Sequence, residues 1–275
     1  MTEERHVFSQ ENPMSTQAHV DVHRQRQAAT QAAFFLPHLR SGMSLLDCGC
    51  GPGTITLGLA DLVAPATVIG IDQSAERVAE AREAAGLAGV GNVLFEIGDA
   101  MSLVYSDGSF DAVFENCVFM HLADAPSAAR EILRVLRPGG IFGARDHDHD
   151  YDVGSNMGLV AESRQAVDEW RAGLGSNMRF GKLLPSLLSD AGFTDLLCSA
   201  TFDNYTTPDQ VEAVRSAWES DRRRPEFIDW VVSQGLAGRS EAERFRGQVN
   251  MWAASQSTFW AFCGIEVIGR KSDGP

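Results

Sequence analysis

The sequence lacks the features that would direct a protein to a membrane or to nucleic acid. No run approaches the roughly 18 apolar residues that cross a bilayer, and no apolar segment of the kind found in secretory signals follows residues 1–6. Basic residues are few, with 23 Lys and Arg against 37 Asp and Glu and a net charge of −14. Because phosphates and anionic lipids attract basic surfaces, we expect neither nucleic acid nor a membrane as a partner.

Paired cysteines are also lacking. The five cysteines, at positions 48, 50, 117, 198 and 263, are odd in number and form no C-x-x-C pair. This pattern is typical of neither a disulfide framework nor a zinc ribbon. We therefore expect small, buried cysteine side chains in a reducing compartment, and a cytoplasmic protein.

The sequence does contain short apolar runs that alternate with amphipathic segments. The predicted strands are 43–46, 67–71, 92–97, 110–115 and 141–144, and the helices between them are 55–62, 74–87 and 125–136. This alternation predicts βαβ units, and therefore an α/β fold with a parallel sheet covered by helices on both faces.

Other segments flank this alternating region. A helix is expected over 17–39 before it, and after residue 145 we expect helices at 155–175 and 182–191, a strand at 193–202, a helical block at 208–256 and a last strand at 259–270. No linker is long enough to divide the chain. We predict a single domain, 1–275, made of an N-terminal helical segment (1–40), a core (41–150) and two helical insertions (151–180 and 207–256).

The first predicted strand runs into a loop with glycine at positions 49, 51 and 53. Glycine lets a ligand approach the backbone, and this loop would lie at the carboxyl edge of the sheet, where ligands bind in such folds. The spacing departs from the dinucleotide pattern G-x-G-x-x-G, and the loop has no P-loop lysine. The glycines alone are also compatible with a structural turn.

Carboxylates accompany the strand ends beside this loop. Asp72 ends the second strand, 19 positions after Gly53, where it can accept hydrogen bonds from ribose hydroxyls. Asp99 ends the third strand and can reach an adenine amino group, while Asp47 in the loop can anchor a cationic group or brace the turn. Each alone can cap a loop, but three at successive strand ends favour a nucleoside ligand.

Six segments between residues 40 and 146 carry a family resemblance: 46–54 (LDCGCGPGT), 68–72 (VIGID), 98–100 (GDA), 106–113 (SDGSFDAV), 121–124 (HLAD) and 134–140 (RVLRPGG). In order and spacing they resemble the class I S-adenosylmethionine (SAM)-dependent methyltransferases. The resemblance is to the small-molecule branch similar to ubiquinone and menaquinone biosynthesis enzymes. It implies a Rossmann-like, doubly wound sheet of seven strands, the last antiparallel, with helical lid insertions.

The resemblance also implies SAM as cofactor. It assigns the glycine-loop backbone to the methionine part, Asp72 and Gln73 to the ribose, Asp99 and Ala100 to the adenine, and Asn116 to the region of the amino group. The complete set of cofactor-binding residues expected is Asp47, Gly49, Cys50, Gly51, Gly53, Asp72, Gln73, Asp99, Ala100 and Asn116.

Methyl transfer from a sulfonium is an in-line displacement, for which a protein mainly supplies proximity and alignment. A general base helps only where the acceptor must lose a proton. The candidates are His121, near the implied substrate opening, and Asp146 or His147. The last two belong to segment 145–152, which, if extended, places histidines on one face and acids on the other. A solvated acidic loop and a divalent metal site are the alternatives there, and we predict no metal.

The remaining candidates lie outside the core segments. Aromatic residues in the helical insertions, including Trp218, Phe227 and Trp252, are typical of a core, but a lid over an apolar acceptor is the alternative. The basic run 222–224 is interpreted as a solvated helix face. His19, His23 and Arg24 share one face of the N-terminal helix and are candidates for a cofactor or substrate contact.

The sequence therefore predicts a cytoplasmic SAM-dependent methyltransferase. Its partner would be a small-molecule methyl acceptor, apolar or aromatic and of natural-product or quinone-like type, with a homodimer left open. Two alternatives remain, a non-methylating cyclase or dehydratase on the same scaffold and a catalytically silent SAM-binding regulatory protein. Residues 41–199 hold 22 acidic and 10 basic residues, an imbalance that we interpret as attraction for a cationic cofactor.

Overall fold

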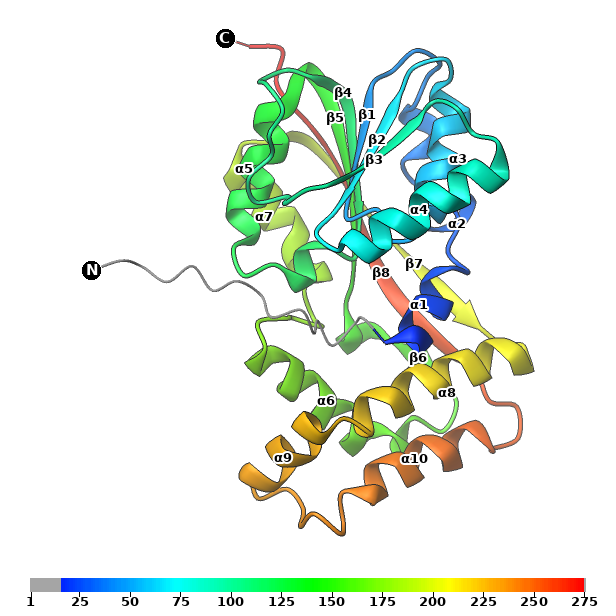
Figure 1. Cartoon of the computed structure of the whole chain (residues 1–275). Coiled ribbons are helices and arrows are strands. Elements are labelled where there is room, and N and C mark those ends of the chain that lie inside the picture. Colours follow the sequence, from blue (N-terminus) through cyan, green and yellow to red (C-terminus); the bar gives the residue numbers. More distant parts are fainter. Residues whose placement is uncertain (1–15, 275) are drawn as a thin grey trace.

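The computed structural model describes residues 16–274, and a mixed β-sheet is its central element (Figure 1). The strands are β1 (Leu45–Cys48), β2 (Val68–Asp72), β3 (Val93–Ile97), β4 (Phe110–Asn116), β5 (Leu136–His147), β6 (Val153–Gly154), β7 (Thr194–Tyr205) and β8 (Trp260–Arg270). Seven follow the order β3-β2-β1-β4-β5-β8-β6, and β7 also pairs with β8. β1 to β5 are parallel and β8 is antiparallel, as predicted, while the two-residue β6 brings the sheet to eight strands.

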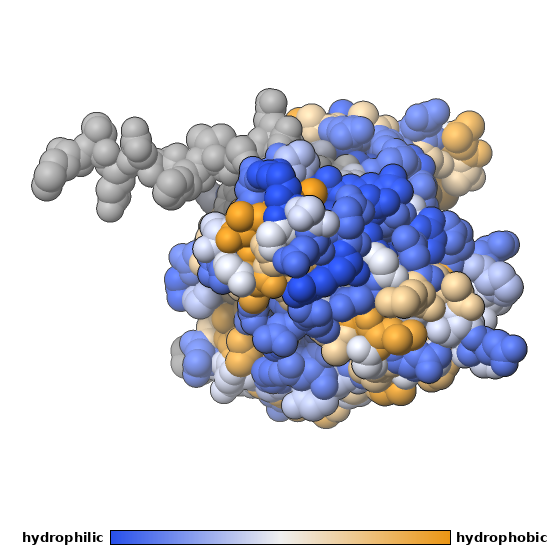
Figure 2. All heavy atoms as spheres, turned by 90° about the horizontal axis from the view of Figure 1, so that it is seen from below, coloured by the Kyte–Doolittle hydropathy of each residue, from blue (hydrophilic) through white to orange (hydrophobic). Residues whose placement is uncertain are grey.

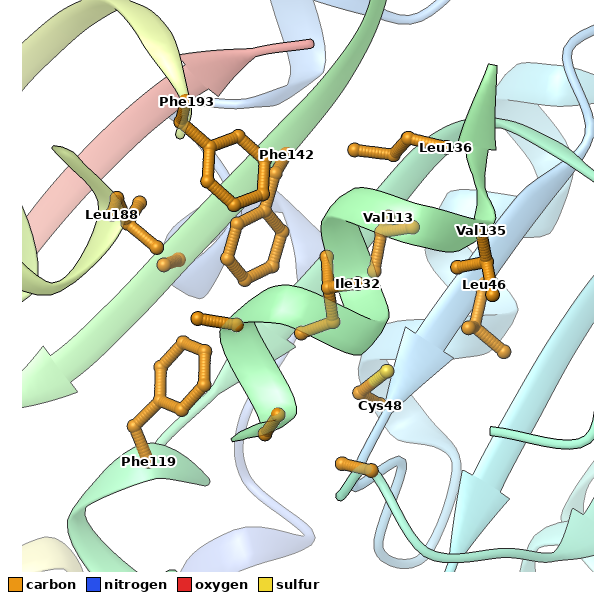
Figure 3. Packing of buried hydrophobic residues seen from close by; sticks show 14 of the residues in the cluster. Leu46, Cys48, Val113, Phe119, Ile132, Val135, Leu136, Phe142, Leu188 and Phe193 are labelled. Carbon is orange, nitrogen blue, oxygen red and sulfur yellow. The ribbon is translucent and has the colours of Figure 1, made fainter. Parts of the chain in front are cut away.

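Helices cover both faces of the sheet, as the alternation predicts. On one face lie α2 (Ala28–Gln31), α3 (Thr54–Val63) and α4 (Ala75–Ala88), and on the other lie α5 (Ala125–Val135) and α7 (Leu184–Ala191) (Figure 1). Figure 3 shows the second face, where Ile132 and Leu188 pack with Phe142 and Phe193 in one buried cluster. This apolar packing fixes the strand ends that carry the candidate site.

The predicted helix over 17–39 is wrong, because the segment forms three short pieces. They are α1 (Gln17–His23), α2 and a 3-10 turn at Leu36–His38. Gln27 between the first two is extended, with ψ of 151°. Phe35 is buried and stacks on Phe114 of β4 at 5.5 Å between ring centroids, while α1 packs against α8 (Pro208–Arg222). One straight helix could not reach both partners, so packing overrides the helical pattern.

A second group of helices lies beyond the carboxyl end of β5 (Figure 1). It consists of α6 (Ala161–Gly173), α8, α9 (Pro225–Ser233) and α10 (Glu243–Ala253). Trp252 and Trp260 are fully buried, and Trp218 lies 4.9 Å from each of them between ring centroids. The aromatic residues therefore form cores within this group, and its outer surface is mostly hydrophilic (Figure 2).

The basic run 222–224 is not a uniform solvated face. Arg222 is 2% exposed, and its guanidinium donates to the backbone carbonyls of Trp218 at 2.6 Å and Ser163 at 3.0 Å. It joins α6 to α8, whereas the side chain of Arg223 is 60% exposed. The interpretation as solvent-facing charge is wrong for Arg222, because helix packing encloses it. Within residues 16–274, no helix has the length and apolar character needed to cross a membrane.

Candidate functional site

The glycine loop connects β1 to α3 at the carboxyl edge of the sheet. Gly49, Gly51 and Gly53 have φ values of +75°, +53° and +82°, in the left-handed region that favours glycine. A Cβ on Gly49 would lie 2.3 Å from Val118, and one on Gly53 would lie 2.9 Å from Ala81, whereas one on Gly51 would meet nothing within 4 Å. Packing therefore requires glycine at positions 49 and 53, whereas Gly51 lies next to free space.

Asp72 ties this loop to the end of β2. Its carboxylate accepts the N–H of Gly51 at 3.0 Å and the N–H of Ser74, the N-cap of α4, at 2.8 Å. Burial raises the pKa of this carboxyl, against the lowering effect of the two hydrogen bonds. Asp72 thus fixes the backbone at Gly51 and lies beside the free space next to this glycine.

Two further predicted residues continue this edge. Gln73 donates to the carboxylate of Asp99 at 3.2 Å, and the N–H of Met101 binds the same oxygen at 2.8 Å. Ala100 is buried in the core just behind them. The strand ends of β2 and β3 are therefore linked to each other and to the glycine loop, and the binding of a nucleoside there stays a prediction.

Asp47 lies in β1 just before the loop and Cys50 lies within the loop, and both side chains are buried. Asp47 is 2% exposed and accepts the hydroxyl of Thr56 at 2.6 Å, which ties the end of β1 to the first turn of α3. Burial raises the pKa of Asp47 to about 7 and also raises the pKa of the Cys50 thiol. Of the two roles expected for Asp47, this contact corresponds to bracing the turn.

The end of β4 presents a polar pair. Asn116 is 8% exposed, its amide oxygen accepts from Arg145 Nη1 at 3.2 Å, and its Nδ2 is buried without a hydrogen-bond partner. Cys117 follows with φ of +59°, and its N–H donates to the carbonyl of Arg145 at 2.7 Å. An unused amide donor therefore lies at the position expected for a cofactor contact.

Segment 145–152 is not a solvated acidic loop, so that alternative is wrong. Arg145, Asp146 and Asp148 have no exposed surface, and His147 is 7% exposed. β5 continues to His147 because β8 supplies an antiparallel partner for this stretch, and a 3-10 turn at His149–Tyr151 then ends the period-two pattern. Among the residues described, no group of three His, Cys, Asp or Glu side chains could hold a metal ion.

Asp203 of β7 joins this segment, and sequence reasoning did not find it. Its carboxylate binds Arg145 Nη2 at 2.9 Å and His147 Nε2 at 3.0 Å. Burial alone would lower the pKa of His147, but Cys117 and Asp203 outweigh burial and raise it to about 9. His147 is therefore a cation at neutral pH, a state that does not suit a general base.

Asp146 directly precedes His147 and interacts with Glu115, a second buried acid. The sequence analysis did not identify Glu115. Asp146 accepts the N–H of Met120 at 3.4 Å, and Glu115 accepts the N–H groups of Arg145 and Val118 at 2.9 and 3.0 Å. Burial raises the pKa of both carboxyls, and the charge of Asp146 raises that of Glu115 further. Both acids lie inside the protein rather than on the open side of the site.

His121 lies across the site, in a 3-10 turn at Phe119–His121. Its Nδ1 is 3.2 Å from the hydroxyl of Ser176. Burial and the charges of Arg171 and Arg26 lower the pKa of His121 to about 3, so the ring is neutral at physiological pH. A neutral imidazole can accept a hydrogen bond from an O–H or N–H group of a bound molecule.

The three candidates on the N-terminal helix have different surroundings. Burial, and then the charge of Arg26, lower the pKa of His23, and His121 also contributes. His19 instead lies 3.2 Å from Arg171 and 3.6 Å from Asp221, which fixes α1 to α6 and α8. Arg24 is exposed and pairs with Asp21 and Glu80. His19 and His23 both interact electrostatically with His121, and a contact of this helix with cofactor or substrate stays a prediction.

Comparison with known proteins identifies the family. A model described as a methyltransferase domain matches residues 39–212. The chain belongs to the class I SAM-dependent methyltransferases. A trans-aconitate 2-methyltransferase from Deinococcus radiodurans is 34% identical over 83% of this chain and 87% of its own. A probable methyltransferase, ltbC of Aspergillus luteorubrus, is 40% identical over 54% of this chain and 56% of its own.

A solved structure resembles most of this methyltransferase chain. The [4+2]-cyclase SpnF is 26% identical, with a TM-score of 0.55 over 90% of this chain and 82% of its own. For several of the curated relatives that it matches, the chain spans about half of their length. Those relatives whose names specify a substrate specify different ones.

Proposed function

We propose that the chain binds SAM along the carboxyl edge of β1 to β4 and transfers its methyl group to a small organic acceptor. The observation that carries this proposal is the free space over Gly51, held open by the hydrogen bond from its N–H to Asp72. The unpartnered Nδ2 of Asn116 supports it, because a buried donor without an acceptor favours a ligand that supplies one.

In this proposal the backbone at 49–53 would hold the methionine part of SAM, Asp72 and Gln73 the ribose, and Asp99 the adenine. Asn116 would face the amino acid end of the cofactor. When bound, SAM supplies a methyl group activated by the sulfonium. The chain then contributes position, alignment and exclusion of water, for which we propose helical segments 151–180 and 207–256 as the cover.

For the acceptor we propose a polar, anionic molecule. An apolar or aromatic acceptor would suit an aromatic lid, but the large aromatic side chains pack in cores within the helical group. The groups that interact electrostatically with His121 are instead basic side chains, namely Arg171, Arg26, His147 and His19. The relative named for trans-aconitate, a carboxylate acceptor, supports the same class.

Among the three catalytic candidates, we propose His121 as the residue that contacts the acceptor and takes a proton where one must leave. Its neutral ring supports this role. Asp146 and His147 are then proposed as positioning residues, the first because it is fully buried and the second because it is held as a cation by its neighbours.

Calorimetry with S-adenosylhomocysteine tests cofactor binding through two matched glycine variants. Gly51 and Gly89 have φ values of +53° and +68°, and a Cβ on either meets no protein atom within 4 Å. G51A and G89A therefore both place alanine in the left-handed region, but only the first fills the proposed cofactor space. We expect affinity to fall at least tenfold in G51A and to stay unchanged in G89A. Equal affinities would refute the site.

A non-methylating enzyme remains the second candidate, because the similar structure SpnF is a cyclase. Incubation with SAM labelled in its methyl group and a panel of small carboxylates separates the two. Label in an acceptor supports methyl transfer. Conversion of a substrate while SAM stays intact supports a cyclase or dehydratase, and cofactor binding with no conversion supports a regulatory protein.

A further inference from the structure

We propose that Arg145 is a positioning residue for the cofactor, because it holds the side-chain amide of Asn116 in one orientation. In that orientation Nδ2 of Asn116 donates to the carboxylate at the methionine end of SAM. The inference rests on the proposed function and deepens it, since it names the atom that binds, the group that is bound and the residue that fixes the amide.

Arg145 and Asn116 lie opposite each other near the ends of two neighbouring strands. They are partners in the parallel pairing of β4 with β5, and Arg145 Nη1 donates to Asn116 Oδ1 at 3.2 Å. A guanidinium has N–H donors and no acceptor, whereas an amide has an oxygen at one end and N–H donors at the other. If the amide of Asn116 turned by half a rotation, its NH2 group would face the donors of Arg145 inside the protein. Arg145 therefore fixes the oxygen toward itself and leaves Nδ2 to a different partner.

The guanidinium of Arg145 is itself fixed by its neighbours. The side chain has no exposed surface, and Asp203 accepts from Nη1 at 3.3 Å and from Nη2 at 2.9 Å. Glu266 of β8 lies 3.5 Å from Nε. Gly264, also of β8, lies so close to the guanidinium that a Cβ there would overlap it. Two carboxylates and a close backbone therefore hold the guanidinium in one place, so that it can orient the amide of Asn116.

The amide donor that remains on Asn116 selects one of the two charged groups at the methionine end of SAM. Nδ2 has no hydrogen-bond partner among residues 16–274, and a buried donor of this kind favours a ligand that supplies an oxygen. The ammonium at that end only donates, whereas the carboxylate only accepts. The family resemblance associates Asn116 with the region of the amino group. The fixed amide assigns its side chain to the neighbouring carboxylate instead.

Two ligands that differ at the methionine end test the inference on the full chain. S-adenosylhomocysteine carries the carboxylate and the ammonium, whereas methylthioadenosine keeps the adenosine and the sulfur and has neither charged group. Calorimetry gives both affinities for each variant, and circular dichroism establishes that the variant is folded. A change confined to S-adenosylhomocysteine reports on the methionine end, and an equal change for both ligands reports on damage to the fold.

Asn116→Asp tests which charged group is bound. Aspartate keeps an oxygen for Arg145 and places a second, anionic oxygen where Nδ2 lies. We expect the affinity for S-adenosylhomocysteine to fall at least about tenfold, because two carboxylates then meet, and the affinity for methylthioadenosine to stay within about twofold. A rise for S-adenosylhomocysteine would place the ammonium there, and an unchanged affinity would mean no contact, so either result would overturn the inference. Asn250→Asp, at an exposed position on α10, is the matched control and should change neither affinity.

Arg145→Lys and a double variant test the positioning role. Lysine keeps the positive charge for Asp203 but presents one ammonium in place of the planar guanidinium, so the amide of Asn116 is no longer fixed. The affinity for S-adenosylhomocysteine should fall about threefold or more in R145K and about tenfold in N116A. The double variant N116A/R145K should bind like N116A, since Arg145 acts through Asn116. Additive losses, or an equal loss for both ligands in R145K, would leave Arg145 a structural role and overturn the inference.

Failure of this inference differs from failure of the proposed function. The Asn116 variants leave the ion pairs of Arg145 with Asp203 and Glu266 intact, so they decide the inference even where R145K does not fold. If the wild type bound neither ligand, the cofactor site itself would be refuted. If the wild type bound both ligands with the same affinity, the cofactor site would stand and the contact with the carboxylate would be refuted.

Discussion

Asp203 accepts a hydrogen bond from His147 across 3.0 Å, although 56 residues separate them in the sequence. The contact forms because β7 pairs with β8, and β8 pairs in turn with β5. The second half of the chain therefore contributes directly to the polar centre beside the glycine loop. That centre unites an arginine, an imidazolium and a carboxylate that are almost completely enclosed by protein.

Replacement of Asp203 by asparagine should destabilise the fold. The change removes the charge that pairs with buried Arg145 and with His147, and breaking such a network costs about 3–5 kcal/mol. Urea unfolding at pH 7 measures the loss. The matched control is Asp195→Asn, an exposed position on the same strand with φ of 52°, a conformation that asparagine tolerates. Similar stability in both variants would contradict the network.

The sequence was sufficient to predict the core of the sheet because each element there carries its own signal. The apolar run before Gly49 and the capped helix after Ser74 form as predicted, and the last strand is antiparallel, as the family resemblance implied. Local patterns identify local elements, and the glycine loop fixes which edge of the sheet binds ligands.

Other features could not be predicted, because they depend on partners distant in the chain. Glu115 at the end of β4 and Asp203 in β7 belong to no motif, and only strand pairing brings Asp203 to the ends of β4 and β5. Arg222 resembles surface charge in the sequence and is buried by packing of α8 on α6. The segment after Arg145 has an acidic composition, yet its first residues are buried because β8 is long enough to pair with them.

Replacement of Arg222 by alanine should lower stability by about 2–4 kcal/mol, whereas Arg223→Ala should change it by less than about 0.5 kcal/mol. Arg222 donates to two backbone carbonyls, and its loss leaves them without those donors inside the helical group. Arg223 is the adjacent residue, is largely exposed and pairs with Glu219. Chemical denaturation of both variants gives the comparison, and equal effects would argue against the buried role of Arg222.

Replacement of Asp72 by asparagine should weaken S-adenosylhomocysteine binding at least tenfold, or about 1.4 kcal/mol. The carboxylate accepts N–H groups from both Gly51 and Ser74, and an amide has one acceptor oxygen for the two. The N–H of Gly51 or that of Ser74 then loses its hydrogen-bond acceptor, and the ribose of the cofactor loses its proposed acceptor. Isothermal titration calorimetry measures the change, with Asp61→Asn on the exposed side of α3 as control. Unchanged affinity in the Asp72 variant would refute its assignment to the cofactor.

Replacement of Asp47 by asparagine should alter how stability depends on pH. Burial raises the pKa of Asp47 to about 7, whereas the same group in the unfolded chain titrates near 3.9. Between these values the folded protein binds the extra proton, so the free energy of unfolding falls as pH rises from about 4 to 7 and levels off above that. Three pH units correspond to about 4 kcal/mol at most.

Asparagine keeps the carbonyl that accepts the Thr56 hydroxyl but has no proton to lose. Asp47→Asn should therefore gain stability relative to wild type between pH 5 and pH 8, by about 2–3 kcal/mol. Urea unfolding of the cofactor-free protein at the two pH values measures this gain. Asp61→Asn, at an exposed position, controls for the general effect of removing an acid. If the Asp47 variant and wild type lost stability in parallel over this range, the carboxyl would already be ionised in the fold, and its place just before the loop would need another explanation.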